Sequence, residues 1–160
     1  MDVQSKDLIS SALRGAANKL AQDPVLIDVS QRLGIAESFL LVSAPSSRQV
    51  RAIAEEIMDE IGRDYHIIPQ RIEGRSEGTW VLADYGDVVI HVMSQEDREF
   101  YALERLWSDQ TITRLELPDV APGAAVRRVM TPSQVIEEAD RFSSSWTDRL
   151  QRPASFPRDY

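Results

Sequence analysis

The chain has 160 residues, no cysteine and a formal net charge of −8. This length is enough for one domain with a buried core, and the absence of cysteine excludes disulfide bonds, thiol nucleophiles and cysteine-based zinc sites. The apolar runs are short, and the first residues lack the basic and then apolar pattern of a secretion signal, so we expect a soluble, cytoplasmic protein with no membrane segment.

The negative charge is concentrated in the first two thirds of the chain. Residues 1–107 contain 18 of the 26 acidic residues and 11 of the 18 basic residues. An acidic surface repels a phosphate backbone and gains nothing from counterion release. We therefore expect little direct contact with RNA, and we expect a basic protein as the partner.

The first part of the chain predicts a helix, two strands and a loop. Residues 7–21 have apolar side chains at helical spacing, with Pro24 shortly after them as a stop. A short β-branched run at 25–29 predicts a strand, and the apolar run at 38–43 predicts a strand that is buried on both faces. The residues between these two strands, 31–37, contain Gly34 and are expected to form a loop or a turn.

A second amphipathic helix is predicted at 46–61. Ser46 and Ser47 are expected to cap its start, and Gly62 is suited to the left-handed conformation that ends a helix. The tripeptide Ser46-Ser47-Arg48 has a second interpretation as an anion site, because free backbone N–H groups point outward at a helix start. Capping explains the same serines without a ligand.

Another strand is predicted at 65–72, and Pro69 places it at the edge of a sheet or at a bulge, because proline cannot donate a backbone hydrogen bond. A charged, glycine-containing loop at 73–78 follows it. Residues 79–93 then predict a β-hairpin with a two-residue turn at Tyr85-Gly86. The expected strand pairs are Asp84 with Asp87, Leu82 with Val89 and Trp80 with His91.

The two faces of this hairpin differ in chemistry, because side chains alternate along a strand. The apolar face carries aliphatic side chains only and belongs against a core: Val81, Ala83, Val88, Ile90 and Val92. The mixed face combines an indole, a thioether, aliphatic groups and carboxylates: Trp80, Leu82, Asp84, Asp87, Val89, His91 and Met93. An apolar centre with polar edges is typical of a protein-binding surface.

A helix is predicted to start at Ser94 and to run to Trp107, with its apolar side chains, Phe100 among them, packed inward. Residues 108–130 predict an extended segment, because prolines and a glycine interrupt the scattered apolar residues. A further short helix is expected at 131–142, and residues 143–160 are expected to be loose.

Several of these segments resemble the ribosomal silencing factor family, also called Iojap-like. They are the run Ser-Phe-Leu-Leu-Val-Ser-Ala-Pro-Ser-Ser-Arg-Gln-Val at 38–50, Glu73-Gly74, the hairpin with Gly86-Asp87-Val88-Val89 and His91, and Arg98, Tyr101 and Leu-Glu-Arg-Leu-Trp at 103–107. The resemblance covers about residues 7–108 in a consistent order. It implies an α/β fold, with a mixed β-sheet flanked by helices, similar to nucleotidyltransferases. We therefore expect a silencing-factor domain at 1–108 and a C-terminal extension, partly helical and partly loose, at 109–160.

The resemblance also implies a function. Members of the family bind the large ribosomal subunit through its fourteenth ribosomal protein, on the face that meets the small subunit. This blocks subunit joining and lowers translation when nutrients are scarce. The implied protein is not an enzyme and needs no cofactor or metal, and the implied partner-binding residues are Trp80, Asp84, Tyr85, His91, Met93 and Tyr101.

Trp80 is the expected energetic anchor, because large aromatic side chains at the centre of an interface typically contribute about 2 kcal/mol or more. The corresponding prediction is that Trp80→Ala abolishes binding to large subunits and leaves the melting temperature unchanged.

Three alternatives remain at this point. Asp84, Asp87 and His91 would hold a divalent metal in a nucleotidyltransferase-like enzyme, although Asp-Tyr-Gly-Asp is also ordinary turn chemistry. A helix or a second subunit would simply cover the mixed face, since sheets bury at least one face. In the third alternative, the mixed face pairs with its own copy in a homodimer.

Overall fold

A six-stranded mixed sheet forms the centre of the molecule. The structure is a computed structural model that describes residues 4–119. The strand order is β3-β4-β5-β2-β1-β6; β2 and β5 are parallel, and all other neighbours are antiparallel. The strands are β1 (Gln22–Asp28), β2 (Ser38–Ala44), β3 (Arg71–Glu73), β4 (Trp80–Asp84), β5 (Val88–Ser94) and β6 (Ile112–Arg114), and the helices are α1 (Ser5–Asn18), α2 (Ser30–Leu33), α3 (Ser47–Tyr65), α4 (Gln95–Tyr101) and α5 (Leu103–Leu106).

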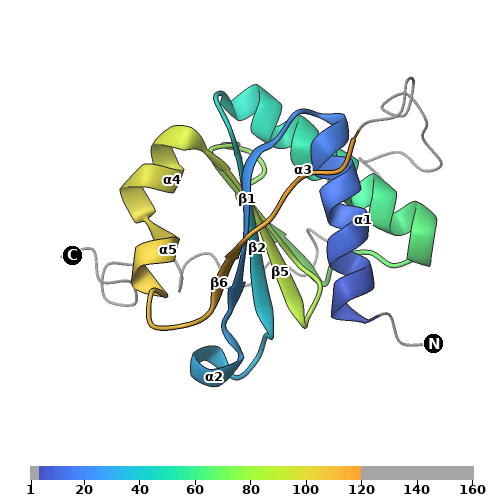
Figure 1. Ribbon diagram of the computed structural model, residues 1–160. Helices are drawn as coiled ribbons and strands as arrows, with labels where there is room; N and C mark the ends of the chain where they lie inside the picture. Colours follow the sequence, from blue (N-terminus) through green and yellow to red (C-terminus); the bar gives the residue numbers. More distant parts are fainter. Residues whose placement is uncertain (1–3, 120–160) are drawn as a thin grey trace.

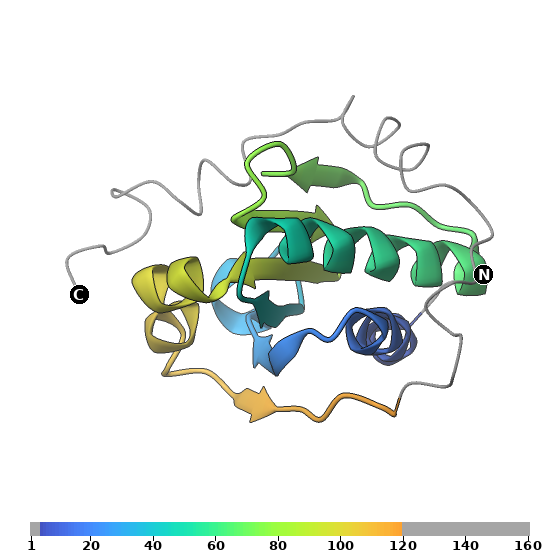
Figure 2. The ribbon, with the colours of Figure 1, turned by 90° about the horizontal axis from the view of Figure 1, so that it is seen from above.

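Helices cover both faces of the sheet, as Figures 1 and 2 show. The two long helices, α1 and α3, pack on one face, and the two short helices, α4 and α5, lie on the other. The chain moves from one face to the other at the central parallel pair, because α3 follows β2 and α4 follows β5. The predicted fold class, a mixed sheet flanked by helices, is confirmed.

Each face of the sheet has its own core. The first core lies under α1 and α3 and is almost entirely aliphatic, with Leu40, Val42, Ile53, Ile57 and Ile90 among its buried side chains. The second core lies on the side of α4 and α5 and is rich in aromatic side chains, with Phe39, Leu41, Trp80, Met93 and Trp107 among its members. Residues of β2 alternate between the two cores, so the prediction that this strand is buried on both faces is confirmed.

The two long helices approach each other closely at Gly15. A Cβ atom added to Gly15 would lie 2.7 Å from the Cα atom of Ile57. Beyond this contact, the side-chain amide of Asn18 donates to the carboxylates of Glu56 and Glu60 at 3.0 and 3.1 Å. The absence of a side chain at Gly15 therefore sets the spacing of α1 and α3, and polar contacts fix their register.

The strand predicted at 65–72 is mostly wrong. Helix α3 continues past Gly62, which is buried within it, and ends at His66, whose left-handed backbone has a φ of 56°. Only the last residues of the predicted range enter the sheet, in β3. β3 is an edge strand, one of the two positions that Pro69 indicated, although Pro69 itself lies before this strand. Gly62 therefore lies inside the helix and does not end it.

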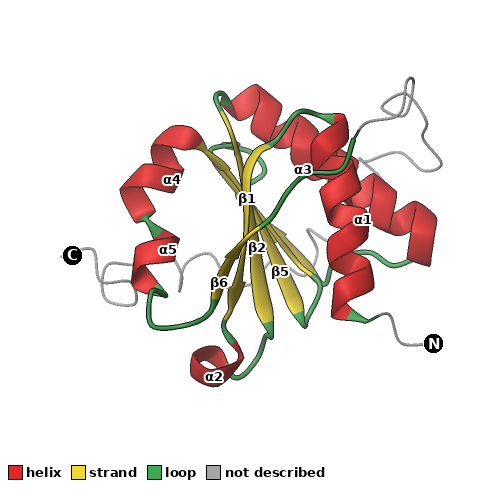
Figure 3. Ribbon diagram, in the orientation of Figure 1, coloured by secondary structure: helices red, strands yellow, loops and turns green. Residues whose placement is uncertain are grey.

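Three further differences concern short elements. The predicted loop at 31–37 contains the single turn of α2. The helix predicted from 94 to 107 is broken at Ala102, whose left-handed backbone has a φ of 48°, and Figure 3 shows this break as a short coil between α4 and α5. Strand β6 lies in the segment that was expected to be an extension, and it pairs with β1 in the same sheet. None of these elements has a strong pattern of its own.

The predicted helix at 131–142 and the loose segment at 143–160 lie outside the described residues. Within residues 4–119, no helix combines the length and the apolar composition that crossing a bilayer requires.

Candidate functional site

The hairpin of β4 and β5 forms as predicted, but its turn lies one residue later. The backbone N–H of Tyr85 donates to the carbonyl oxygen of Val88 at 2.9 Å, so Gly86 and Asp87 are the turn residues. Gly86 has a φ of 92°, a conformation that favours glycine. The strand pairs are Asp84 with Val89, Leu82 with His91 and Trp80 with Met93, in place of the predicted pairs of Asp84 with Asp87, Leu82 with Val89 and Trp80 with His91.

This change of register moves every pair by two residues, and a shift of two keeps each side chain on the same face of a sheet. The apolar face accordingly lies in the first core, against α3. The strand residues of the mixed face lie on the opposite side, with the second core. The predicted separation of the two faces is therefore confirmed, although the predicted pairing is wrong.

A hydrogen bond inside the second core joins Trp80 to His91. The indole Nε1–H of Trp80 donates to Nδ1 of His91 at 3.0 Å. Because Nδ1 accepts, the imidazole is neutral and carries its proton on Nε2. Burial, with a smaller contribution from the charge of Arg98, lowers the pKa of His91 to about 3. This histidine therefore orients an indole rather than titrating near neutral pH.

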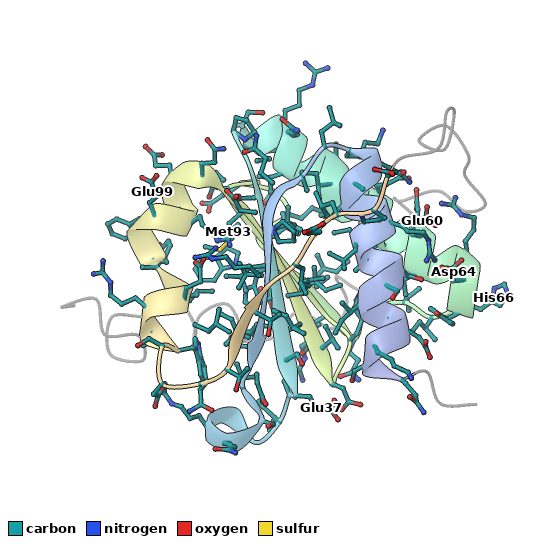
Figure 4. The ribbon with its side chains drawn as sticks, in the orientation of Figure 1. Glu37, Glu60, Asp64, His66, Met93 and Glu99 are labelled. Atoms are coloured by element: carbon teal, nitrogen blue, oxygen red, sulfur yellow. The ribbon has the colours of Figure 1, made fainter. Side chains whose placement is uncertain are left out.

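The prediction that the mixed face is an open surface is wrong. The Trp80 side chain is only 2% exposed, and His91 and Met93 are fully buried. Helices α4 and α5 provide the cover: the rings of Trp80 and Tyr101 have centroids 4.8 Å apart, and Trp107 meets Phe39 edge-on. In Figure 4, Met93 lies between the sheet and α4. The apolar groups of this face are shielded from water by the chain itself, which is the alternative of a covering helix.

Tyr85 does not belong with the other predicted contact residues. It precedes the turn instead of forming its tip, and its ring packs against the first core. Its hydroxyl group is buried, and burial, together with the nearby carboxylate of Asp59, raises the pKa of this hydroxyl. The prediction that Tyr85 is at the tip of the hairpin is therefore wrong, because the turn lies at Gly86 and Asp87.

The two aspartates of the hairpin have the roles of ordinary turn residues. Asp84 is buried, and its Oδ1 atom accepts a hydrogen bond from the backbone N–H of Gly86 at 2.8 Å. Asp87 is an exposed turn residue, and His91 lies deep in the second core. In residues 4–119, no three histidine or acidic side chains come together as a metal-binding group. The site required by the metal-dependent alternative, with Asp84, Asp87 and His91 together, does not form in these residues.

The helix starts follow the capping prediction. The Ser46 side chain accepts from the backbone N–H of Gln49 at 3.2 Å, and Ser94 accepts from Asp97 at 3.1 Å. Capping thus accounts for Ser46, the residue that had also suggested an anion site.

The accessible part of this region is the ring pair, which we define as Phe100 and Tyr101. Phe100 is 67% exposed, contrary to its predicted inward position, and it contacts Tyr101 edge-on with centroids 4.9 Å apart. Tyr101 is half-buried and rests on Trp80. Adjacent residues on a helix point about 100° apart, and here Tyr101 packs against the second core while Phe100 faces solvent.

The fold places the chain in a class of small α/β domains with solved relatives. A crystal structure of a Chromobacterium violaceum protein aligns with a TM-score of 0.62 and 28% identity, covering 77% of this chain and 97% of the other. A crystal structure of a Bacillus halodurans protein aligns with a TM-score of 0.58 and 32% identity, covering 71% of this chain and all of the other.

The sequence identifies the family within this class. The family model described as "Ribosomal silencing factor during starvation" matches residues 2–142. The "Ribosomal silencing factor RsfS" of Bacillus subtilis is 35% identical over 114 residues, which cover 71% of this chain and 96% of the relative. A mouse protein named "Mitochondrial assembly of ribosomal large subunit protein 1" is 30% identical over 107 residues, 64% of this chain and 44% of that protein. The chain belongs to the ribosomal silencing factor family, as its motifs predicted.

Proposed function

We propose that this protein binds the large ribosomal subunit through its fourteenth ribosomal protein and prevents the small subunit from joining. Membership of the silencing-factor family supports this proposal, as does the similarity to a mouse protein named for large-subunit assembly. The protein acts in the cytoplasm by obstruction, without catalysing a reaction. It thereby represses translation.

The observation that carries the proposal is the exposed ring pair on α4. Large aromatic side chains at the surface are typical anchors of protein interfaces, and a solvent-exposed Phe100 beside Tyr101 has no role in the core of the monomer. We assign the direct contact to this ring pair. Of the predicted contact residues, Tyr101 keeps that role.

In this proposal, Trp80, His91 and Met93 contribute to binding indirectly, because they are buried and support the ring pair from the interior. The Tyr101 ring rests on Trp80, the hydrogen bond from Trp80 to His91 fixes the orientation of the indole, and Met93 belongs to the same core. A rigid support reduces the conformational entropy that is lost on binding. Asp84 and Tyr85 keep the hairpin turn in place and do not touch the partner.

The charges around the ring pair favour a basic partner. Glu96 and Glu99 are exposed on α4, and Figure 4 shows Glu99 pointing away from the molecule. The whole chain has a net charge of −8. Such a surface attracts a positively charged protein and repels the phosphates of ribosomal RNA, which favours a ribosomal protein as the direct contact.

Purified ribosomal subunits test the proposal. The protein is mixed with large subunits, small subunits are added, and the species are separated on a sucrose gradient. We expect the protein to sediment with large subunits and to reduce the amount of joined ribosomes. The double variant Phe100→Ala/Tyr101→Ala should lose both effects.

The matched control is Ile35→Ala, because Ile35 is also a large exposed apolar residue, at 58%, and lies in the loop before β2. This variant should bind as well as the unchanged protein. The proposal would be contradicted if the protein sedimented with neither subunit, or if it sedimented only with small subunits. If the protein forms a homodimer that persists unchanged in the complex, the ribosome-binding face lies elsewhere.

A further inference from the structure

The corner between α4 and α5 is held by a single buried arginine. Arg98, which is 9% exposed, donates from Nε to Oε1 of Glu104 at 3.2 Å and from Nη2 to Oε2 of the same residue at 3.1 Å. A two-point contact of this kind fixes the direction of the guanidinium plane as well as its distance from the carboxylate. Arg98 lies in α4 and Glu104 in α5, so this ion pair spans the break at Ala102.

Arg98 also attaches the corner to the sheet. Its Nη2 atom donates to the carbonyl oxygen of Asp23 at 2.9 Å, and its Nη1 atom donates to Oγ of Ser43 at 3.3 Å. Asp23 lies in β1 and Ser43 in β2. One side chain therefore connects α4 with α5 and with two neighbouring strands.

The corner needs such a clamp because its backbone is in an unfavourable conformation. Ala102 has φ and ψ of 48° and 55°, and residues other than glycine adopt this left-handed region only when the surroundings enforce it, at a cost of about 1–2 kcal/mol. The helices on either side are short, with seven residues in α4 and four in α5. Neither helix has enough length to hold this geometry by itself.

The position of the ring pair depends on this corner. Phe100 and Tyr101 immediately precede Ala102, and Tyr101 rests on Trp80 with ring centroids 4.8 Å apart. A rotation of α4 about the corner would separate the ring of Tyr101 from that of Trp80 and would point Phe100 in another direction. Arg98 lies in the same helical turn as Phe100 and Tyr101, so its contacts act directly on the part of α4 that carries both rings.

We propose that Arg98, with Glu104, is a positioning residue for partner binding: it presents the ring pair to the ribosomal partner without touching that partner. This inference rests on the proposed function, and it adds a buried ion pair that sets the geometry of the surface. The two-point contact with Glu104 requires the forked guanidinium group of Arg98, so a lysine with the same charge does not replace it.

The test measures the affinity of the full-length protein for purified large subunits at a temperature at which every variant is folded. Arg98→Lys keeps the charge and loses the fork, and we expect it to bind about tenfold more weakly. Glu104→Gln keeps the contacts of Arg98 to Asp23 and Ser43, so it preserves folding better, and we expect a loss in the same direction. The matched control is Arg63→Lys, which alters the ion pair of Arg63 with Glu60 within α3, on the opposite face of the sheet.

A double-mutant cycle separates positioning from general stability. If Arg98 acts through the ring pair, Arg98→Lys should cause a smaller loss of binding in a Phe100→Ala background than in the unchanged protein, where both rings are present. Fully additive losses would overturn the inference, as would unchanged affinity of both Arg98→Lys and Glu104→Gln, or an equal loss in Arg63→Lys. If the unchanged protein itself fails to bind large subunits, the proposed function fails and this inference fails with it.

Discussion

The two faces of the sheet are covered in different ways. On one face, α1 and α3 have 14 and 19 residues and enclose an aliphatic core. On the other face, α4 and α5 have seven and four residues, and a series of aromatic contacts extends from the interior to the surface. This series joins Phe39 to His91, His91 to Trp80, Trp80 to Tyr101 and Tyr101 to Phe100.

We infer that the two faces have different roles, one mainly in stability and the other in both stability and binding. Long helices with many aliphatic contacts provide stability that does not depend on the geometry of any single ring. Short helices over aromatic rings provide less cooperative stability, but they present large and rigid side chains at the surface. We therefore expect changes under α1 and α3 to affect folding alone, and changes along the aromatic series to affect folding and binding in different proportions.

The largest effect is expected for Trp80→Ala. The indole is 2% exposed, and truncation of a buried tryptophan costs about 3–5 kcal/mol of unfolding free energy. The sequence had predicted an unchanged melting temperature for this variant, and the burial of the ring reverses that expectation. Chemical denaturation monitored by far-UV circular dichroism measures the loss. A stability equal to that of the unchanged protein would show that the ring is not packed as described.

The next effect is expected for Gly15→Ala, on the opposite face. The added methyl group would meet the backbone of Ile57 in α3, and overpacking of this kind costs about 1–3 kcal/mol. Ser10→Ala, at an exposed position of α1, is the control and should change stability little. Below its melting temperature, the Gly15 variant should bind large subunits normally. A loss of binding with intact folding would break the proposed division between the faces.

A pH-dependent effect is expected from His91. Its pKa of about 3 in the folded protein lies below its ordinary value of 6.5, so the unfolded chain takes up the proton first as the pH falls. The stabilising contribution is complete above pH 6.5 and is lost between pH 6.5 and about 3, by about 1.4 kcal/mol per pH unit. Denaturation at pH 7 and pH 5 measures this loss.

The matched variant for this measurement is His91→Asn, whose side-chain oxygen still accepts the indole N–H and does not titrate. The stability difference between the two proteins should shrink as the pH falls from 7 to 5. A difference that stays constant over this range would mean that His91 titrates equally in the folded and unfolded states.

The smallest effect on stability is expected for Glu99→Lys on the exposed side of α4. A surface substitution of this kind typically changes unfolding free energy by no more than about 0.5 kcal/mol. Association with large subunits should nevertheless slow by about two- to tenfold at low salt, because an attractive charge becomes repulsive. Glu116→Lys makes the same charge change after β6, and stopped-flow rates should remain normal in that control. Equal slowing in both variants would indicate a general charge effect rather than a contact at α4.

The elements with strong patterns were predictable from the sequence. The helical spacing in α1 and α3, the uninterrupted apolar run of β2 and the alternation in β4 and β5 each reflect a local periodicity that survives in the fold. The same alternation separated the two faces of the hairpin correctly. The family motifs further defined the kind of protein, because they occur in a consistent order over most of the domain.

The elements without such patterns were missed or misplaced. Strand β6 has three residues and pairs with the edge of β1, and the break at Ala102 is spanned by the ion pair of Arg98 and Glu104. The hairpin turn lies one residue later than predicted, with Gly86 at the first of the two turn positions, where its positive φ is accommodated. For β6 and for the break at Ala102, the contacts join residues that local sequence patterns do not relate.

The position of Trp80 separates what local sequence patterns determine from what tertiary packing determines. Alternating polarity determined which face of the hairpin carries the indole, because the direction of a side chain on a strand is a local property. Whether that face meets water or another part of the chain depends on where α4 and α5 pack, and this was decided only by the tertiary structure. The same packing buried Trp80 and His91 and left Phe100 at the surface, so it also decided which aromatic side chains are available to a partner.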